Sequence, residues 1–279
     1  MNLKDLDKTT TILALLASVL FITAYFPVFR LLASTWAESE EYNHAFLTLP
    51  IIGYMAWNKK SALSLGHPKC SPIGLLLLLF AMPAYFFAML TEVRTIIALA
   101  LFLTIVGTLI YLLGIQALKE LFVPLLLLLL LIPFPEQLYI KLTFPLQLKV
   151  SQASEIIVQM FGAPLLREGN VMNIPEKSFE VVEACSGLRS MITLITLSII
   201  MGYFMLKKNS SKLILLLASV PTAIAINIIR VTAMILLFHF FKLDLTEGTL
   251  HSITGLLIFG IALGILLLLN KVLEAWETE

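Results

Sequence analysis

Long apolar runs separated by short polar stretches make up most of this chain. An apolar run of about 17–25 residues is long enough to cross a bilayer as a helix. We therefore predict an all-α polytopic membrane protein with about eight transmembrane helices. These spans are expected near residues 10–32, 44–58, 72–90, 95–113, 120–133, 186–206, 213–240 and 252–270. The first run lacks a small-x-small cleavage site, so we expect it to remain as the first span.

Composition agrees with a membrane protein and argues against a soluble one. Hydrophobic residues make up 59% of the chain and charged residues 13%. An ordinary soluble domain has about a quarter of its residues charged. The formal net charge is only +1, so the charge balance predicts no nucleic-acid partner.

Residues 134–184 depart from the membrane pattern. Helical alternation over 137–162 predicts an amphipathic helix that lies in the interface or packs across the bundle. Two β-rich runs, 165–174 and 179–183, flank a turn that contains Pro175, and they predict a small hairpin. We treat residues 1–279 as a single membrane domain with 134–184 as an extracytoplasmic insert.

Basic residues in the short loops predict the orientation, because cytoplasmic loops carry an excess of Lys and Arg. With the N-terminus in the cytoplasm, both termini fall inside. The cytoplasmic side then holds Lys4, Lys8, Lys59, Lys60, Lys69, Lys119, Lys207, Lys208, Lys212 and Lys271. The first short loop on the opposite side is acidic.

The segment from Glu183 to Ser190 contains the first candidate for chemistry. Its sequence is Glu-Ala-Cys-Ser-Gly-Leu-Arg-Ser, and Cys185 stands where the polar insert ends and an apolar run begins. A thiol at a helix N-terminus faces unpaired N–H groups and the positive end of the dipole, which favours the nucleophilic thiolate. The alternative is a buried structural cysteine. The other cysteine, Cys70, is expected on the opposite side of the membrane, so the two cannot pair.

Two ionisable residues inside later apolar runs are further candidates. Arg230 follows Asn227 by one helical turn, and an ionisable residue within a span is a functional candidate by default. The alternative is an arginine that reaches toward the interface. His251 begins the last span, where the helix dipole favours the neutral imidazole that a general base needs. Taken alone, it also fits an ordinary interfacial histidine.

Several neighbouring residues can support these three. The backbone N–H groups of Ser186 and Gly187 can donate to an oxyanion. Arg189 lies one turn after Cys185, and Glu183 can orient His251 or Arg230. His44 opens the second span on the outer side and can line the same cavity. The motifs of metalloproteases, P-loop proteins and serine hydrolases do not occur, so we expect neither a metal nor a cofactor.

Together these motifs resemble the exosortase/archaeosortase family of membrane cysteine transpeptidases. The family signatures stand here as Ala184-Cys185-Ser186-Gly187, as Asn227 with Arg230, and as His251 with Gly255. Histidine at the third position resembles the exosortase branch, which is bacterial. The resemblance extends to residues 167–171 and to Glu41-Tyr42-Asn43-His44. This last element usually reads Tyr-Ser-His-Gly, from which Asn43 and Ala45 depart. We expect the single-domain form, without the extra C-terminal domain of longer members.

The resemblance implies a substrate and a mechanism. Exosortase substrates end in a Pro-Glu-Pro-like motif, one transmembrane helix and a basic cytoplasmic cluster. Such a membrane-anchored protein would be cleaved at the outer face of the bacterial inner membrane. Cys185 would form a thioester, with His251 as acid and base and Arg230 as substrate or oxyanion ligand. The family is also associated with exopolysaccharide machinery.

Two other functions fit the same residues. A transporter or flippase would use Arg230, His251 and Glu183 to line a path for an anionic substrate. A non-catalytic membrane subunit of an exopolysaccharide export system would need none of the three. The acceptor that resolves the thioester stays open between water and an amine or hydroxyl.

Overall fold

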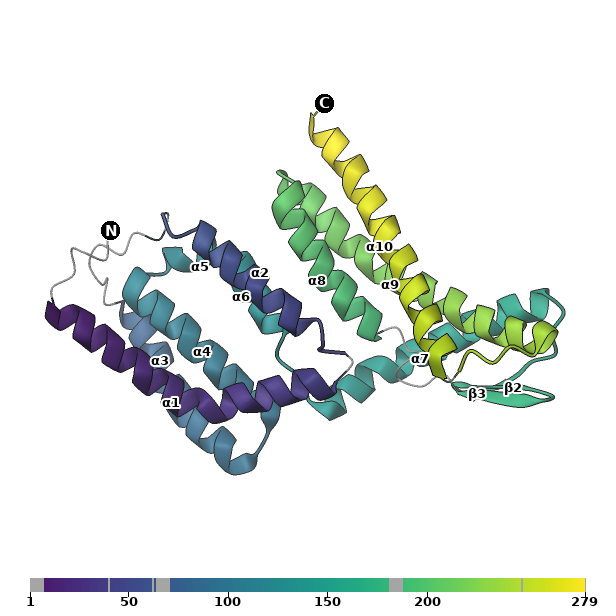
Figure 1. Cartoon of the computed structure of the whole chain (residues 1–279), viewed down its shortest axis with the longest axis horizontal. Helices are drawn as coiled ribbons and strands as arrows, with labels where there is room; N and C mark the ends of the chain where they lie inside the picture. Colours follow the sequence, from purple (N-terminus) through teal and green to yellow (C-terminus); the bar gives the residue numbers. More distant parts are fainter. Residues whose placement is uncertain are drawn as a thin grey trace. The chain divides into compact units, whose positions relative to one another are not determined.

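The computed structural model describes residues 8–39, 41–61, 63, 71–180, 188–246 and 248–278. It is mostly helical, and it divides into two compact units, Met1–Pro135 and Glu136–Glu279, each of which is described here by itself (Figure 1). The organisation as a single membrane domain stays a prediction.

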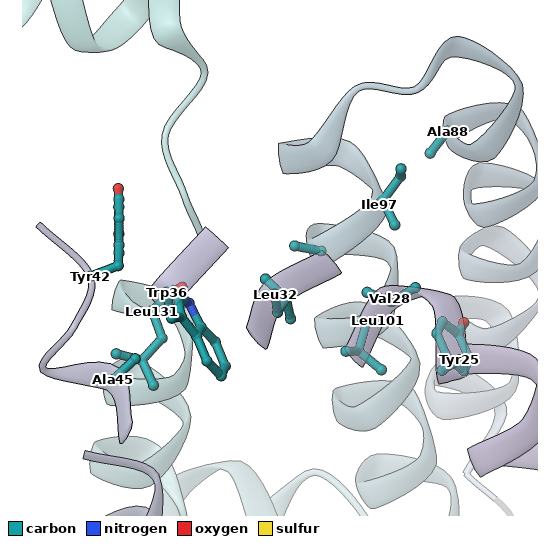
Figure 2. Close-up of a cluster of buried hydrophobic side chains, with 11 residues drawn as sticks. Tyr25, Val28, Leu32, Trp36, Tyr42, Ala45, Ala88, Ile97, Leu101 and Leu131 are labelled. Carbon is teal, nitrogen blue, oxygen red and sulfur yellow. Dashed lines mark hydrogen bonds between the residues drawn. The ribbon is translucent and has the colours of Figure 1, made fainter. Parts of the chain in front are cut away.

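The first unit contains six helices within its described residues. They are α1 Lys8–Glu38, α2 Ala45–Asn58, α3 Pro72–Thr91, α4 Arg94–Leu113, α5 Gln116–Glu120 and α6 Phe122–Leu130. Buried side chains from α1, α2, α3 and α4 form one cluster with Leu131, the residue just after α6 (Figure 2). Two hydrogen bonds join buried polar groups inside this unit: the Tyr25 hydroxyl lies 2.6 Å from the Thr104 hydroxyl, and Trp36 Nε1 donates to the Leu131 carbonyl at 3.0 Å.

Helices α3 and α4 pack at very short range because Gly74 has no side chain. A Cβ on Gly74 would lie 2.3 Å from the backbone nitrogen of Tyr111. Small residues allow this kind of close backbone approach between membrane helices. The Gly74 position therefore fixes how the α3–α4 hairpin closes.

The second unit consists of four helices and a small sheet within its described residues. They are α7 Glu136–Met160, β1 Leu166–Glu168, β2 Val171–Ile174, β3 Lys177–Glu180, α8 Leu188–Met205, α9 Asn209–Phe241 and α10 Gly248–Thr278. The strands form an antiparallel sheet in the order β1-β2-β3. Its inner face, which includes Met172 and Phe179, packs with α7 and α9, while α8, α9 and α10 share a separate core.

The sheet differs from the predicted two-stranded hairpin. Residues 165–174 are not one strand, because the chain reverses at Gly169 and separates β1 from β2. Gly169 has φ +68°, a backbone conformation that glycine adopts without steric cost. Only the second reversal, between β2 and β3, lies at the predicted turn around Pro175.

A helix lies in each of the eight predicted spans, but the helices are not equally suited to cross a bilayer. Within the described residues, five are long and apolar enough: α1, α3, α4, α9 and α10. Helices α2, α6 and α8 are shorter. The chain is therefore a multi-pass membrane protein of mainly helical structure, and the count of eight spans stays a prediction. Helix α9 continues through Pro221 without a break.

Candidate active site

Helices α9 and α10 bring two of the predicted site residues together. Arg230 lies in the C-terminal half of α9, and His251 lies in the first turn of α10. The two helices are held side by side by apolar packing that includes Ala223, Ile226 and Ala262. Both helices are long and apolar enough to span a membrane, so the Arg–His pair joins two candidate membrane spans.

Arg230 donates a hydrogen bond to His251. The guanidinium Nη2 lies 3.1 Å from His251 Nε2. Arginine has no acceptor and stays protonated in proteins, so Nε2 must offer its lone pair. The other ring nitrogen, Nδ1, lies 3.0 Å from the carbonyl oxygen of Leu245 and therefore donates to it. This pattern assigns His251 to the neutral tautomer with its proton on Nδ1.

The loop between α9 and α10 holds the carbonyl that orients His251. Leu245 is buried within this loop. On either side of it, Asp244 and Thr246 bind the same lysine of β3: Lys177 Nζ lies 2.5 Å from Asp244 Oδ2 and 2.9 Å from Thr246 Oγ1. The neighbouring Lys242 pairs with Glu176 at 2.7 Å. The α9–α10 loop supplies the carboxylate of one ion pair and the lysine of the other. Both pairs attach this loop to the turn between β2 and β3.

The charge of Asp244 is stabilised by these contacts. Hydrogen bonds from Lys177 and then from Thr246 lower the pKa of the Asp244 carboxyl from 3.8 to about 2. The hydrogen bond from Lys242 likewise lowers the pKa of the Glu176 carboxyl. Both carboxylates are therefore ionised at neutral pH, as the two ion pairs require.

The side chain of Arg230 packs against Gly255 of α10. A Cβ on Gly255 would lie 3.6 Å from Arg230 Nη2 and 3.9 Å from Cζ. The guanidinium of Arg230 therefore lies in van der Waals range of the position that a larger residue 255 would occupy. Asn227 stands one turn before Arg230 on α9 and is 4% exposed.

The remaining predicted site residues do not add to this geometry. Cys185, Ser186, Gly187 and Glu183 lie outside the described residues, as does the side chain of Arg189 in the first turn of α8. His44 belongs to the first unit, where its Nδ1 lies 3.0 Å from the Glu41 carbonyl oxygen.

Sequence reasoning did not find the groups that orient His251. Leu245 acts through its backbone carbonyl, which has no signature in a residue pattern. Lys177 and Asp244 are 67 positions apart, and surface charges of this kind are common in any polar loop. Only the folded chain shows that they meet.

The fold and this site define a class: a multi-pass helical membrane protein with an arginine–histidine pair between two membrane helices. The sequence model of the transmembrane exosortase family matches residues 36–268, which is most of the chain. The protein therefore belongs to the transmembrane exosortase family. No curated protein and no solved structure matches the chain.

Proposed function

We propose that the protein is a membrane cysteine protease or transpeptidase of exported proteins. The observation that carries the proposal is the Arg230–His251 hydrogen bond, which holds a neutral imidazole next to a permanent cation. Family membership adds the Ala184-Cys185-Ser186-Gly187 element immediately before α8. A thiol, a base and a cation are the groups that thiol acyl transfer needs.

The proposed reaction begins when His251 takes the proton of the Cys185 thiol. The tautomer that the hydrogen bonds assign leaves Nε2 as the basic nitrogen. That lone pair becomes free when Arg230 turns its N–H groups to the substrate. The thiolate then attacks the scissile carbonyl carbon, and negative charge develops on the carbonyl oxygen. Arg230 can stabilise this oxyanion with charge-assisted hydrogen bonds.

The tetrahedral intermediate collapses by breaking the C–N bond. The leaving amine takes the proton from His251, and the acyl group stays on sulfur as a thioester. Water then gives hydrolysis, and an amine or hydroxyl gives transpeptidation, each returning a proton to His251 and freeing the thiol. The substrate we propose is a protein anchored by a C-terminal Pro-Glu-Pro-type motif, a helix and a basic tail. Its cleavage would take place at the outer face of the bacterial inner membrane, in a system linked to exopolysaccharide.

The test is substrate processing in cells. A reporter that ends in this tripartite signal is co-expressed with the wild-type chain, Cys185→Ala, Arg230→Lys and His251→Asn, and is followed by gel shift and mass spectrometry. Cys70→Ala is the matched control for loss of a thiol. We expect cleavage by the wild type and the control, none by Cys185→Ala, and little by the other two, because lysine lacks the planar guanidinium fork.

Persistent cleavage by Cys185→Ala would disprove the thiol mechanism. A requirement for Arg230 but not for Cys185 would instead favour a transporter or flippase. If Cys185→Ala, Arg230→Lys and His251→Asn all support the same cellular function as the wild type, a non-catalytic subunit would be favoured. The mass of the new C-terminus distinguishes hydrolysis from transfer to another acceptor.

A further inference from the structure

A cavity of about 340 Å³ lies at the end of the α3–α4 hairpin, between the hairpin and α1. Val28 of α1 and Ile97 of α4 line it and are buried, at 0% and 5% exposed (Figure 2). Glu92, which follows α3, and Arg94, which begins α4, line the same cavity and are exposed. Its volume falls within the range of about 300–1,000 Å³ that is typical of ligand sites. The cavity thus combines buried apolar residues with one exposed carboxylate and one exposed guanidinium.

The protein surface around these two charges is apolar. At the same ends of α3 and α4, the exposed side chains include Phe86, Phe87, Leu90, Val93 and Ile96. Helices α1, α3 and α4 are each long and apolar enough to span a membrane, so we expect lipid to cover this surface. With 20 residues each, α3 and α4 match the hydrocarbon thickness of about 30 Å. If both helices span, the turn between them lies at the level of the lipid headgroups.

The structure shows no partner for either charge inside the protein. Within the described residues, no ion pair or hydrogen bond involves the side chain of Glu92 or of Arg94. Charged groups near the hydrocarbon are unfavourable unless they are hydrated or paired. A ligand that fits this cavity therefore carries an anion for Arg94, a cation for Glu92 and apolar chains for the surface beside them.

We propose that this cavity binds a phospholipid with an ethanolamine headgroup. The lipid phosphate pairs with Arg94, and the primary ammonium donates hydrogen bonds to the Glu92 carboxylate. The acyl chains meet the apolar lining and the exposed apolar side chains beside it. A choline headgroup has no N–H to donate, and an anionic headgroup supplies no cation for Glu92. Binding of this lipid does not depend on the chemistry of Cys185 or His251.

The test is lipid binding to the purified full-length chain in detergent, followed by native mass spectrometry. Ethanolamine, choline and glycerol phospholipids with identical acyl chains are compared, and we expect one saturable site that prefers the ethanolamine lipid. Arg94→Gln should weaken all three lipids about tenfold, because each loses its charge-assisted hydrogen bonds to the phosphate. Glu92→Gln should weaken the ethanolamine lipid alone, also about tenfold, and so remove the preference.

Two exposed charges of α1 provide matched controls. Arg30→Gln and Glu38→Gln remove the same charges outside the cavity and should bind lipid as the wild type does. Leu31→Trp fills the cavity without a change of charge and should also weaken the ethanolamine lipid. The thermal midpoint of each charge variant should equal that of the wild type, because these side chains are exposed.

Several results would overturn the proposal. They are the absence of a saturable site, equal affinity of the wild type for the three lipids, and an equal loss of binding in the controls. Complete displacement of the lipid by inorganic phosphate would show a site for the anion only. Displacement by the transmembrane helix of the tripartite-signal reporter would assign the cavity to the substrate instead.

Discussion

The guanidinium of Arg230 lies against Gly255, so the size of the side chain at position 255 should determine whether Arg230 can reach His251. An alanine Cβ would meet Arg230 Nη2 at 3.6 Å, an ordinary van der Waals distance, so Gly255→Ala should keep activity within about threefold. A leucine would displace the guanidinium from His251. Because small displacements of catalytic groups are costly, Gly255→Leu should lower the cleavage rate about 100-fold.

Gly260 gives the matched control for this pair of variants. It lies on the same helix, and nothing approaches within 4 Å of a Cβ placed there. Gly260→Leu should therefore cleave the reporter at the wild-type rate while adding the same bulk to α10. Equal loss of activity in both leucine variants would show that α10 tolerates no added bulk, and that the Arg230 contact is not the cause.

Two of the predicted site residues, Arg230 and His251, form a hydrogen bond with each other, and their role stays a prediction. Arg230 and His251 stand out in the sequence because an ionisable residue in an apolar run has few structural explanations. The buried polar residues of α7 do not stand out in the sequence, because polar residues are ordinary on an amphipathic helix. In the folded chain, five of the seven buried residues of α7 carry a hydroxyl or an amide. The sequence pattern of α7 shows two faces but does not say which of them is buried.

At the scale of elements, the ion pairs between the β2–β3 turn and the α9–α10 loop determine how His251 is held. Asp244 has a pKa of about 2 in the folded chain and an ordinary value of 3.8. A lowered carboxyl pKa contributes stability that is complete above the ordinary value and is lost as the pH falls through the folded value. We therefore expect the loop to loosen between about pH 4 and pH 2.

Asp244→Asn should abolish this pH dependence. Hydrogen exchange of the amides in the α9–α10 loop measures how much the loop loosens at each pH. The exchange rates of the wild type and the variant should become equal at the lowest pH. The change in global stability should stay below about 1 kcal/mol, because both side chains are partly exposed. Activity at neutral pH should nevertheless fall in Asp244→Asn and recover in the charge-reversed pair Lys177→Asp with Asp244→Lys. A variant loop as rigid and active as the wild type would contradict the role of the pair.

The α3–α4 hairpin depends on an even tighter contact. An added Cβ at Gly74 would overlap the Tyr111 backbone, which a side-chain rotation cannot relieve. Gly74→Ala should destabilise the protein by about 1–3 kcal/mol, the usual cost of overpacking. Gly53→Ala is the control, since that position is open and alanine is the better helix former. Thermal unfolding in detergent should show a lower midpoint for the first variant only.

The helices themselves were predictable, whereas their packing was not. A helix lies in each of the eight apolar ranges, but within the described residues only five of these helices are long and apolar enough to span a membrane. Helix α5 was missed because five residues between two apolar runs give no periodic signal. The close approach at Gly74 also escaped prediction, because one glycine in an apolar run resembles any other until its neighbour is known.

At the scale of the whole molecule, the second unit determines which ends of its helices share a side of the membrane. Glu277, near the end of α10, accepts hydrogen bonds from the backbone nitrogens of Lys207 and Lys208 at 2.6 and 2.8 Å. The turn between α8 and α9 and the C-terminal end of α10 are therefore neighbours. The loop that contains Asp244 follows the other end of α9, which is long enough to cross a bilayer. If α9 spans, Lys207 and Asp244 must lie on opposite sides.

The excess of lysine at one end predicts which side is which. Lys207, Lys208 and Lys212 lie at or just after the α8–α9 turn, and Lys271 lies in the C-terminal part of α10, so this end should be cytoplasmic. With Cys70 and Cys185 replaced by alanine, single cysteines at Lys207 and Leu243 report the two ends. A membrane-impermeant maleimide should label Leu243→Cys in intact spheroplasts and Lys207→Cys only after permeabilisation. The opposite pattern would move Arg230 and His251 to the cytoplasmic half, where they could not process an exported substrate from the outer face.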